Sequence, residues 1–346
     1  MKKILRLISA MLCMTMIMGF VGCTPTDEPQ PSATPSAQPK PMPTKTNIRI
    51  VGLKGPTGLG MSKLMADNES GTAANQYTFT LSSATDEVAA MVAKGEVDIA
   101  AVPTNLAANL YQKTNGKWQL AALNTLGVLY IMENGNTIQN IQDLKGKTIY
   151  ASGAGATPQY ILEFILKQNQ IDPQKDVTIH WSSEHSEVVA LCASNQASIG
   201  LLPEPNVTTL QTKNANFRIA LDITKEYETA CGLAGVEGNF LAMGSVIVNK
   251  EFAKNNPEAI VAFMAEYKAS TEYVNTNVDH AAQLAVKYGI IGAEAIAKKA
   301  IPNCNITFIS GAEMKAGIKQ FYQVLFDANP KAVGGSLPGE EFYYQG

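Results

Sequence analysis

Two stretches of this chain, DEVAAMVAKGEVDIAAVPTN (residues 86–105) and SEVVALCASNQASIGLLPEPN (residues 186–206), repeat one pattern. Each has apolar residues at helical spacing, followed by a short apolar run that ends at a proline, Pro103 or Pro203. The change from helical spacing to a continuous apolar run predicts a helix, a strand and a tight turn in each stretch. Because the spacing is the same in both, we interpret them as equivalent parts of two similar α/β lobes. The competing interpretation is that any two strand–helix units look alike.

The rest of the chain also alternates between strand-like and helical segments, which is typical of α/β layers. Apolar runs predict further strands at 48–53, 77–82, 118–124, 128–132, 148–151 and 177–181. Turns rich in Gly, Pro and Thr connect these runs to helices, the first of them at about 60–67. After Gly244 a strand and a helix opened by Asn256-Pro257-Glu258 are expected, and the remainder is mainly helical. We expect these last helices to pack on the first lobe.

The beginning of the chain resembles the leader of a bacterial lipoprotein. A basic start precedes an apolar run at 7–21, which is too short and wrongly flanked for a transmembrane span. Small residues then precede Cys23 as in a lipobox, so we predict a signal peptide at 1–22 and lipidation of Cys23. Ordinary secretion with cleavage nearby is the alternative. Residues 23–46 are rich in Pro, Thr and Ser, which predicts a disordered, extended tether.

Composition restricts the class of protein further. The net charge of −3 is spread without a basic patch, so nucleic acid is not expected as a partner. The chain after the tether is long enough for two domains. Its cysteines are Cys192, Cys231 and Cys304, without CxxC spacing, which argues against a disulfide framework. We expect each to be a buried thiol, and a bridge between one pair is left open.

Four strand-to-helix turns share small and mostly uncharged residues. They are Pro56-Thr57-Gly58, Pro103-Thr104-Asn105, Gly153-Ala154-Gly155-Ala156-Thr157 and Pro203-Glu204-Pro205. Ligands of open α/β sheets bind at the carboxyl ends of the strands, where N–H groups at helix starts attract anionic or carbonyl oxygens. One such turn is explained by turn chemistry alone. Four of them, two in each lobe, predict a ligand cleft between the lobes.

One carboxylate stands among these turns. Glu204 lies between two prolines at a strand end, where it either accepts a hydrogen bond from a ligand N–H or caps its own turn. Lys54 and Lys63 are the lysines nearest to the first turn, and neither needs to point inward. The aromatic residues that either stack on a ligand ring or pack in the core are Tyr130, Tyr160 and Trp181.

No catalytic or cofactor motif is recognisable. The first turn, GPTGLGMS (55–62), lacks the lysine of a phosphate-binding loop, and the chain has no G-x-S-x-G elbow. The histidines have no metal-ligand spacing, and we expect His180 and His185 in a surface loop. We therefore predict a binding protein with no catalytic residue, no metal and no cofactor.

Four segments, in this order, resemble the solute-binding lipoproteins of bacterial ABC importers. They are KGEVDIAAVPTN (94–105), IQDLKGKTIYASGAGATPQYIL (141–162), IGLLPEPNVTTL (199–210) and NKEFAKNNPEAI (249–260). The resemblance extends over about residues 47–330. It is closest to the branch that handles nitrate, sulfonates, taurine and thiamine-precursor pyrimidines, the NMT1/THI5-like or SsuA/TauA-like proteins. It implies a type II periplasmic-binding fold, in which two α/β lobes are joined by two crossover strands.

The resemblance also implies how the chain is divided. Residues 47–132 and 229–346 would form lobe I and residues 133–228 lobe II, with crossings near Met132–Gly135 and Asp222–Glu228. A solute bound in the cleft would favour the closed state by hinge motion. A monomer is expected.

The implied function is solute capture on the outer side of a bacterial membrane. The lipid-anchored protein would deliver a small organic solute to a membrane permease that a cytoplasmic ATPase drives. By position, the residues facing the solute would be Pro56, Thr57, Gly58, Thr104, Asn105, Gly155, Thr157 and Glu204. None of the four turns contains arginine, so a partly aromatic or heterocyclic organic solute is favoured over a small inorganic anion.

Two other functions share this fold. A ligand sensor that signals to a membrane receptor would have the same cleft. A pyrimidine-precursor-synthesising enzyme would need a cysteine-rich iron site, and the scattered cysteines argue against it. Cys304, flanked by amide side chains, is the place to test that alternative.

Overall fold

The computed structural model describes residues 45–235 and 240–346. The predicted signal peptide, Cys23 and nearly all of the tether lie outside the described residues, so these predictions stay predictions. The described residues belong to one compact unit. Within the described ranges, no helix combines the length and the apolar character that crossing a bilayer requires.

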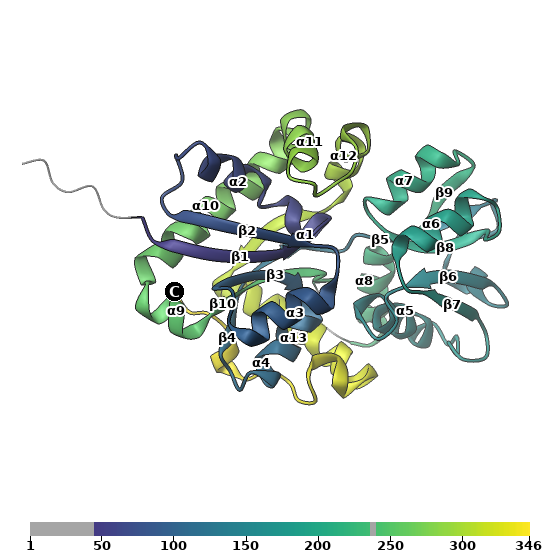
Figure 1. Ribbon diagram of the computed structural model, residues 1–346. Coiled ribbons are helices and arrows are strands. Elements are labelled where there is room, and N and C mark those ends of the chain that lie inside the picture. Colours follow the sequence, from purple (N-terminus) through teal and green to yellow (C-terminus); the bar gives the residue numbers. More distant parts are fainter. Residues whose placement is uncertain (1–44, 236–239) are drawn as a thin grey trace, which may run out of the picture. The chain divides into compact units, whose positions relative to one another are not determined.

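The chain builds two β-sheets, each accompanied by helices (Figure 1). The first sheet has six strands in the order β11-β4-β10-β3-β1-β2. These strands are β1 (Asn47–Leu53), β2 (Gln76–Ser82), β3 (Ile99–Pro103), β4 (Trp118–Thr125), β10 (Gly244–Asn249) and β11 (Ile306–Ser310). β1 pairs in parallel with β2 and β3, whereas β10 runs antiparallel between β3 and β4. We refer to this sheet and its helices as lobe I.

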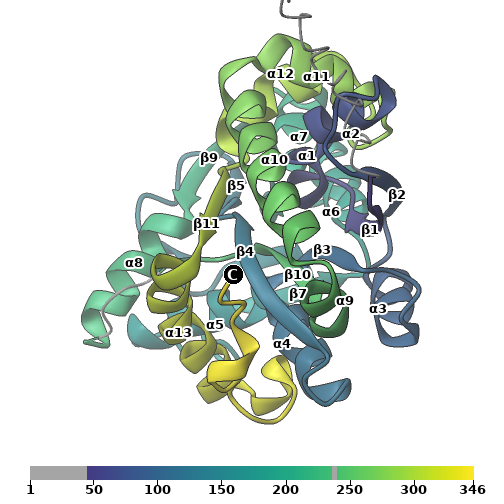
Figure 2. The same ribbon diagram turned by 90° about the vertical axis from the view of Figure 1, so that its left-hand side faces the viewer.

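The helices of lobe I follow its strands and fill the carboxyl-terminal part of the chain. They are α1 (Pro56–Leu59), α2 (Ser62–Glu69), α3 (Thr85–Lys94), α4 (Thr104–Lys113), α9 (Lys250–Asn255), α10 (Pro257–Thr276), α11 (Val278–Lys287), α12 (Glu294–Ala300) and α13 (Gly311–Ala328). The helix expected at 60–67 is α2, and the short helix α1, which was not predicted, precedes it. α10 runs beside β11 (Figure 2), which confirms that late helices pack on the first lobe.

Short 3-10 turns join the remaining segments. They are η1 (Ile141–Leu144), η2 (Ile301–Asn303), η3 (Pro330–Val333) and η4 (Glu340–Phe342). Phe342 is fully buried against the rings of Tyr111 and Tyr322, so the end of the chain packs into the core under α4.

The second sheet has five strands in the order β7-β6-β8-β5-β9. Its strands are β5 (Leu129–Asn134), β6 (Thr148–Ser152), β7 (Thr178–Ser182), β8 (Ile199–Pro203) and β9 (Phe217–Asp222). Its helices are α5 (Thr157–Gln168), α6 (His185–Ala193), α7 (Asn206–Lys213) and α8 (Ile223–Leu233). β6 is parallel to β7 and β8, and β5 is antiparallel to β8 and β9. This sheet with its helices is lobe II.

The two sheets have equivalent strand orders. In lobe I the order β2-β1-β3-β10-β4 matches β7-β6-β8-β5-β9 in lobe II, including which neighbours are parallel. The repeated sequence pattern falls on α3-β3-α4 in one lobe and on α6-β8-α7 in the other. Pro103 and Pro203 are the last residues of their strands. The predicted internal repeat is therefore confirmed.

The connections between the lobes lie elsewhere than expected. β5 pairs with β8 and β9, so the chain enters the second sheet directly after β4, through residues 126–128. A boundary at residue 132 falls inside this strand. After β9, α8 packs on α5 and β5, so the chain stays in lobe II as far as Leu233. An apolar run alone does not reveal which sheet it joins, and that is why the expected crossings were displaced.

Candidate ligand-binding cleft

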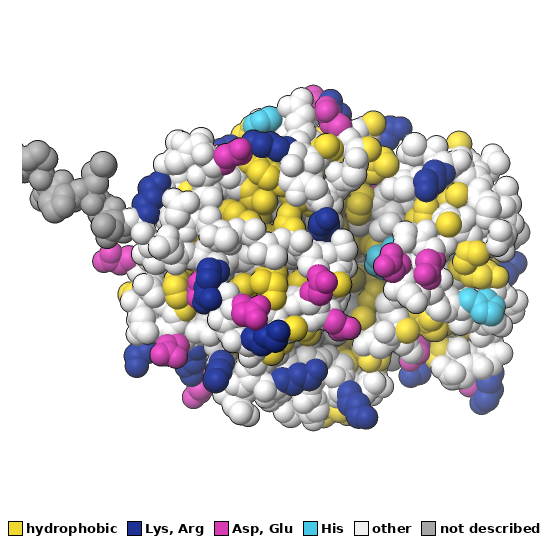
Figure 3. All heavy atoms as spheres, viewed as in Figure 1, with side chains coloured by type: hydrophobic (Ala, Val, Ile, Leu, Met, Phe, Trp, Pro, Cys, Tyr) yellow, Lys and Arg dark blue, Asp and Glu magenta, His cyan; other side chains and the backbone are white. Residues whose placement is uncertain are grey.

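A hollow with hydrophobic side chains along it runs between the two lobes on one face of the molecule (Figure 3). The starts of α4 and α5 meet across the lobes, because the Thr157 hydroxyl donates to the side-chain amide oxygen (Oδ1) of Asn105 at 3.2 Å. Both side chains are buried. The structure thus brings together two of the predicted site residues, one from each lobe.

Thr104, next to Asn105, is the most unusual polar residue of this region. It is fully buried, and its Oγ1 has no hydrogen-bond partner among the described residues. Its backbone is fixed, since the Tyr322 hydroxyl donates to the Thr104 carbonyl at 3.0 Å and the Thr104 N–H donates to Met243. A buried hydroxyl without a partner costs about 1–3 kcal/mol. A polar ligand atom at the start of α4 would supply the missing partner.

The first turn offers less to a ligand than expected. Pro56 has no N–H, and the N–H groups of Gly58 and Leu59 both donate to the Gly55 carbonyl. Thr57 is half-buried, and its carbonyl accepts a hydrogen bond from Asn124 at 3.1 Å. A Cβ on Gly58 would overlap the carbonyl oxygen of Leu53. Close backbone packing therefore explains this glycine.

Gly155 lies at the exposed edge of the turn before α5. Its N–H donates to the Gln159 side chain at 2.7 Å, and its carbonyl accepts from the Tyr160 hydroxyl at 3.2 Å. The Tyr160 hydroxyl also accepts from the amide of Asn329 at 3.2 Å, which links α5 of lobe II to the segment after α13. Tyr160 thus serves a contact between the lobes, and the ligand role of Gly155 stays a prediction.

Glu204 is a buried carboxylate at the end of β8. Only 2% of the residue is exposed, and its side chain accepts from the Thr208 N–H at 3.2 Å and the Thr208 hydroxyl at 3.0 Å. Burial raises the pKa of Glu204, and the two hydrogen bonds from Thr208 oppose that rise. No ion pair among the described residues involves Glu204. The site therefore contains a carboxyl group that a donor from a ligand could satisfy further.

Tyr130 and Cys304 lie within electrostatic range of Glu204. Burial, with smaller effects of the nearby Asp222 and Glu204 carboxylates, raises the pKa of Tyr130 to about 12. Burial, with a smaller effect of Glu204, raises the pKa of the Cys304 thiol. Cys304 follows η2 of lobe I, so this cluster also joins the lobes. A buried, protonated thiol is a poor iron ligand, and the described residues contain no group of three or more His, Cys, Asp or Glu placed to hold a metal.

A histidine that was expected elsewhere lies at the end of β6. The expectation of His185 in a surface loop is wrong: it is the first residue of α6, partly buried, and its Nδ1 is hydrogen-bonded to the hydroxyl of Ser152 at the end of β6. Burial lowers the pKa of His185 to about 4, against the opposing effect of Glu184. His180 is also outside a loop, at an exposed position of β7. No local sequence signal links Ser152 to His185, because α5 and β7 lie between β6 and α6 in the chain.

Other side chains considered for the site are engaged elsewhere. Lys63 pairs with Asp67 and lies over the ring of Tyr273, and Lys54 is exposed. Trp181 packs partly buried against the core of lobe II. The expectation of buried cysteines is confirmed for the residues Cys192, Cys231 and Cys304.

A family model matches most of the chain. Residues 68–298 match the family described as "ABC transporter, phosphonate, periplasmic substrate-binding protein". The chain therefore belongs to this family of periplasmic substrate-binding proteins. Over 127 residues it is 25% identical to YtlA of Bacillus subtilis, described as a binding protein; the match covers 36% of this chain and 34% of YtlA. The chain thus spans about a third of the length of this curated relative.

Solved structures show the same fold. An ABC transporter protein from Parabacteroides distasonis is 22% identical with a TM-score of 0.72, over 87% of this chain and 99% of that one. The aliphatic sulphonate binding protein SsuA from Escherichia coli is 14% identical with a TM-score of 0.68, over 87% and 93%. The nitrate-binding protein NrtA from Synechocystis PCC 6803 is 12% identical with a TM-score of 0.52, over 72% and 68%. The predicted periplasmic-binding fold of two α/β lobes is confirmed.

Proposed function

We propose that this protein captures a small organic solute between its lobes and delivers it to the membrane permease of an ABC importer, driven by a cytoplasmic ATPase. Membership of the substrate-binding family supports this proposal. The observation that carries it is the start of α4, where the buried hydroxyl of Thr104 has no hydrogen-bond partner among the described residues and lies beside the contact of Asn105 with Thr157. Anchoring through a lipidated Cys23, a monomeric state and a place in the NMT1/THI5-like branch belong to the same proposal.

The chemistry of the residues suggests the class of solute. Thr104 and the N–H groups at the start of α4 suit an oxygen of the solute. Glu204 suits an N–H or ammonium group, because its carboxyl is buried and has no cationic partner among the described residues. We propose an organic solute with an oxygen acceptor at one end and a nitrogen donor at the other. Binding, and not catalysis, is the proposed role of these groups.

We also propose revised boundaries for the lobes. Lobe I comprises 47–125 and the chain from about 240 onward, and lobe II comprises 129–233. The three residues after β4 form one connection between the lobes. Hinge motion at this connection would open and close the cleft.

Thermal unfolding with a panel of solutes tests this function. The panel contains phosphonates, sulfonates, nitrate, pyrimidines, purines and amino-acid derivatives. A ligand at a hundred times its Kd stabilises the folded state by about 2.7 kcal/mol, which a melting curve resolves. We expect Thr104→Val and Glu204→Gln to lose the shift, and Thr229→Val, an exposed change on α8, to keep it. A shift that survives both cleft variants would contradict the proposed site.

A further inference from the structure

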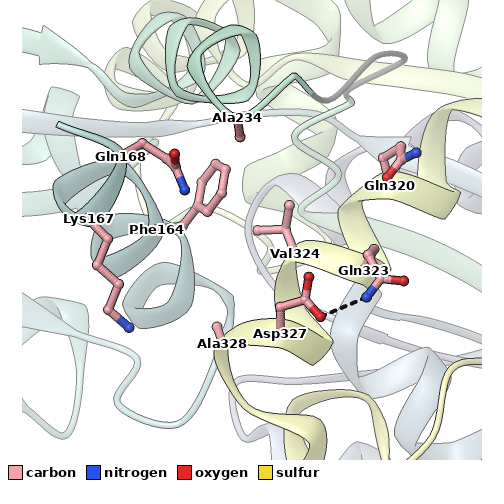
Figure 4. Close-up of a pocket in the computed structure, with 9 residues that line it drawn as sticks. All are labelled: Phe164, Lys167, Gln168, Ala234, Gln320, Gln323, Val324, Asp327 and Ala328. Atoms are coloured by element: carbon pink, nitrogen blue, oxygen red, sulfur yellow. Dashed lines mark hydrogen bonds between the residues drawn. The ribbon is translucent and has the colours of Figure 1, made fainter. Parts of the chain in front are cut away.

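We propose that a groove between α5 and α13 is a second small-molecule site, which takes a neutral flat ring with a carboxamide-type edge. The groove has a volume of about 310 Å³, at the lower end of the range for ligand pockets. α5 contributes Phe164 and Gln168, and α13 contributes Gln320, Val324 and Ala328 (Figure 4). The site goes beyond the proposed function, because no predicted cleft residue lines it.

The groove is separated from the cleft along α5. Thr157, in the cleft, is the first residue of that helix, and Phe164 and Gln168 are on its second half. At a rise of 1.5 Å per residue, they lie about 10–16 Å further along the helix axis. A molecule of the size of one ring in the groove therefore does not reach Thr157.

The base of the groove is apolar. The rings of Phe164 and Tyr227 pack with their centroids 5.8 Å apart, which restricts the orientation of Phe164. Val324 is buried, and Ala328 follows one turn later on α13. Phe164 and Val324 point into the space between the helices from opposite sides (Figure 4). An aromatic face and a methyl-rich wall at this spacing suit a flat ring, which gains from both contacts.

The rim of the groove is polar but has no net charge. The carboxamides of Gln168 and Gln320 make no hydrogen bond to other described residues, whereas Gln323 donates to Asp327 at 2.7 Å. Lys167 and Asp327 are exposed and opposite in charge. Because their charges balance, the groove favours a neutral molecule over an ion. Each carboxamide offers one acceptor and two donors, which match a carboxamide on the ligand.

The groove lies between helices of different lobes, which hinge motion would move relative to each other. α5 belongs to lobe II and α13 to lobe I, and the amide of Asn329 and the hydroxyl of Tyr160 join the two at 3.2 Å. A molecule that touches both helices has a different affinity for each arrangement of the lobes. It must then shift the population of these arrangements, and through it the affinity of the cleft for its solute.

Nicotinamide is a suitable probe, since it is neutral, flat and carries a carboxamide. We expect saturable binding in ligand-observed NMR titrations, weakened at least tenfold in Ala328→Trp, whose indole would fill the groove. Ala316→Trp, on an exposed position of the same helix, should bind as the wild type does. Thr104→Val should also leave nicotinamide binding unchanged, which separates this site from the cleft. Absence of saturable binding, equal binding in Ala328→Trp, or loss in Thr104→Val would each overturn the second site.

The coupling between the lobes is tested by distance measurement. Spin labels at Lys113→Cys on α4 and Lys213→Cys on α7 report the separation of the lobes, and both positions are exposed. Saturating nicotinamide should shift the distance distribution in the labelled protein and not in the same protein carrying Ala328→Trp. A distribution that nicotinamide leaves unchanged would overturn the coupling.

Discussion

The partly buried imidazole of His185 predicts a loss of stability in mild acid that one substitution removes. In the unfolded chain this side chain binds a proton near its ordinary pKa of 6.5, whereas burial lowers its pKa in the folded protein to about 4. Between these values the unfolded state binds the proton more tightly. The contribution of His185 to the free energy of unfolding is therefore fully present above pH 6.5 and is lost as the pH drops toward 4. Each pH unit in this window contributes about 1.4 kcal/mol, so the whole window is worth about 3 kcal/mol.

Urea unfolding at pH 7 and at pH 4.5 measures this loss. His185→Gln keeps a polar side chain next to Ser152 but cannot take up a proton, so it should lose about 2–3 kcal/mol less than the wild type between the two pH values. His180→Gln is the matched control, because His180 is exposed on β7. This variant should lose as much stability between the two pH values as the wild type does. The carboxylates that titrate in the same range are common to all three proteins and cancel in the comparison. Equal losses in the wild type and in His185→Gln would refute the reasoning.

Three further changes have defined outcomes. Phe342→Ala removes a fully buried ring from the core under α4 and should destabilise the protein by about 3–5 kcal/mol in calorimetry, whereas a loss below 1 kcal/mol would show that the chain end is not part of this core. Gly58→Ala places a methyl group against the Leu53 carbonyl and should destabilise by about 1–3 kcal/mol in urea unfolding; an unchanged midpoint would contradict that contact. Glu204 has a raised pKa in the folded state, so its contribution to folding stability is lost as the pH rises from 4.5 through that pKa. The melting temperature of Glu204→Gln should therefore rise relative to that of the wild type between pH 4.5 and 7.5. Parallel plots of melting temperature against pH would contradict burial of the carboxyl group.

The sequence predicted the architecture well because the architecture depends on local patterns. The change from helical period to an apolar run ending at Pro103 and Pro203 identified the same unit in both lobes. Parallel strands, helix starts and their turns all follow from such patterns. The sheet to which β5 belongs did not follow, since that depends on pairing with β8 and β9, which are distant in the chain.

The candidate site was predictable only in part. Turn chemistry selected Thr104, Asn105 and Thr157, and the fold brings the last two into contact although they are far apart in sequence. The pair of Ser152 and His185 was not predictable, because neither residue belongs to a recognisable motif and their contact arises from the packing of α6 against the end of β6. The missing partner of Thr104 likewise became visible only from the burial of its hydroxyl.

The internal repeat has a consequence for how a solute is oriented. The residue that follows the closing proline is Thr104 in one lobe and Glu204 in the other, so one backbone position presents a neutral hydroxyl on one side and a carboxyl group on the other. Two copies with the same residue here would accept a solute in either direction. If the proposed cleft binds its solute through both groups, only one head-to-tail direction satisfies them, so a nearly symmetric backbone would still impose one orientation on the solute.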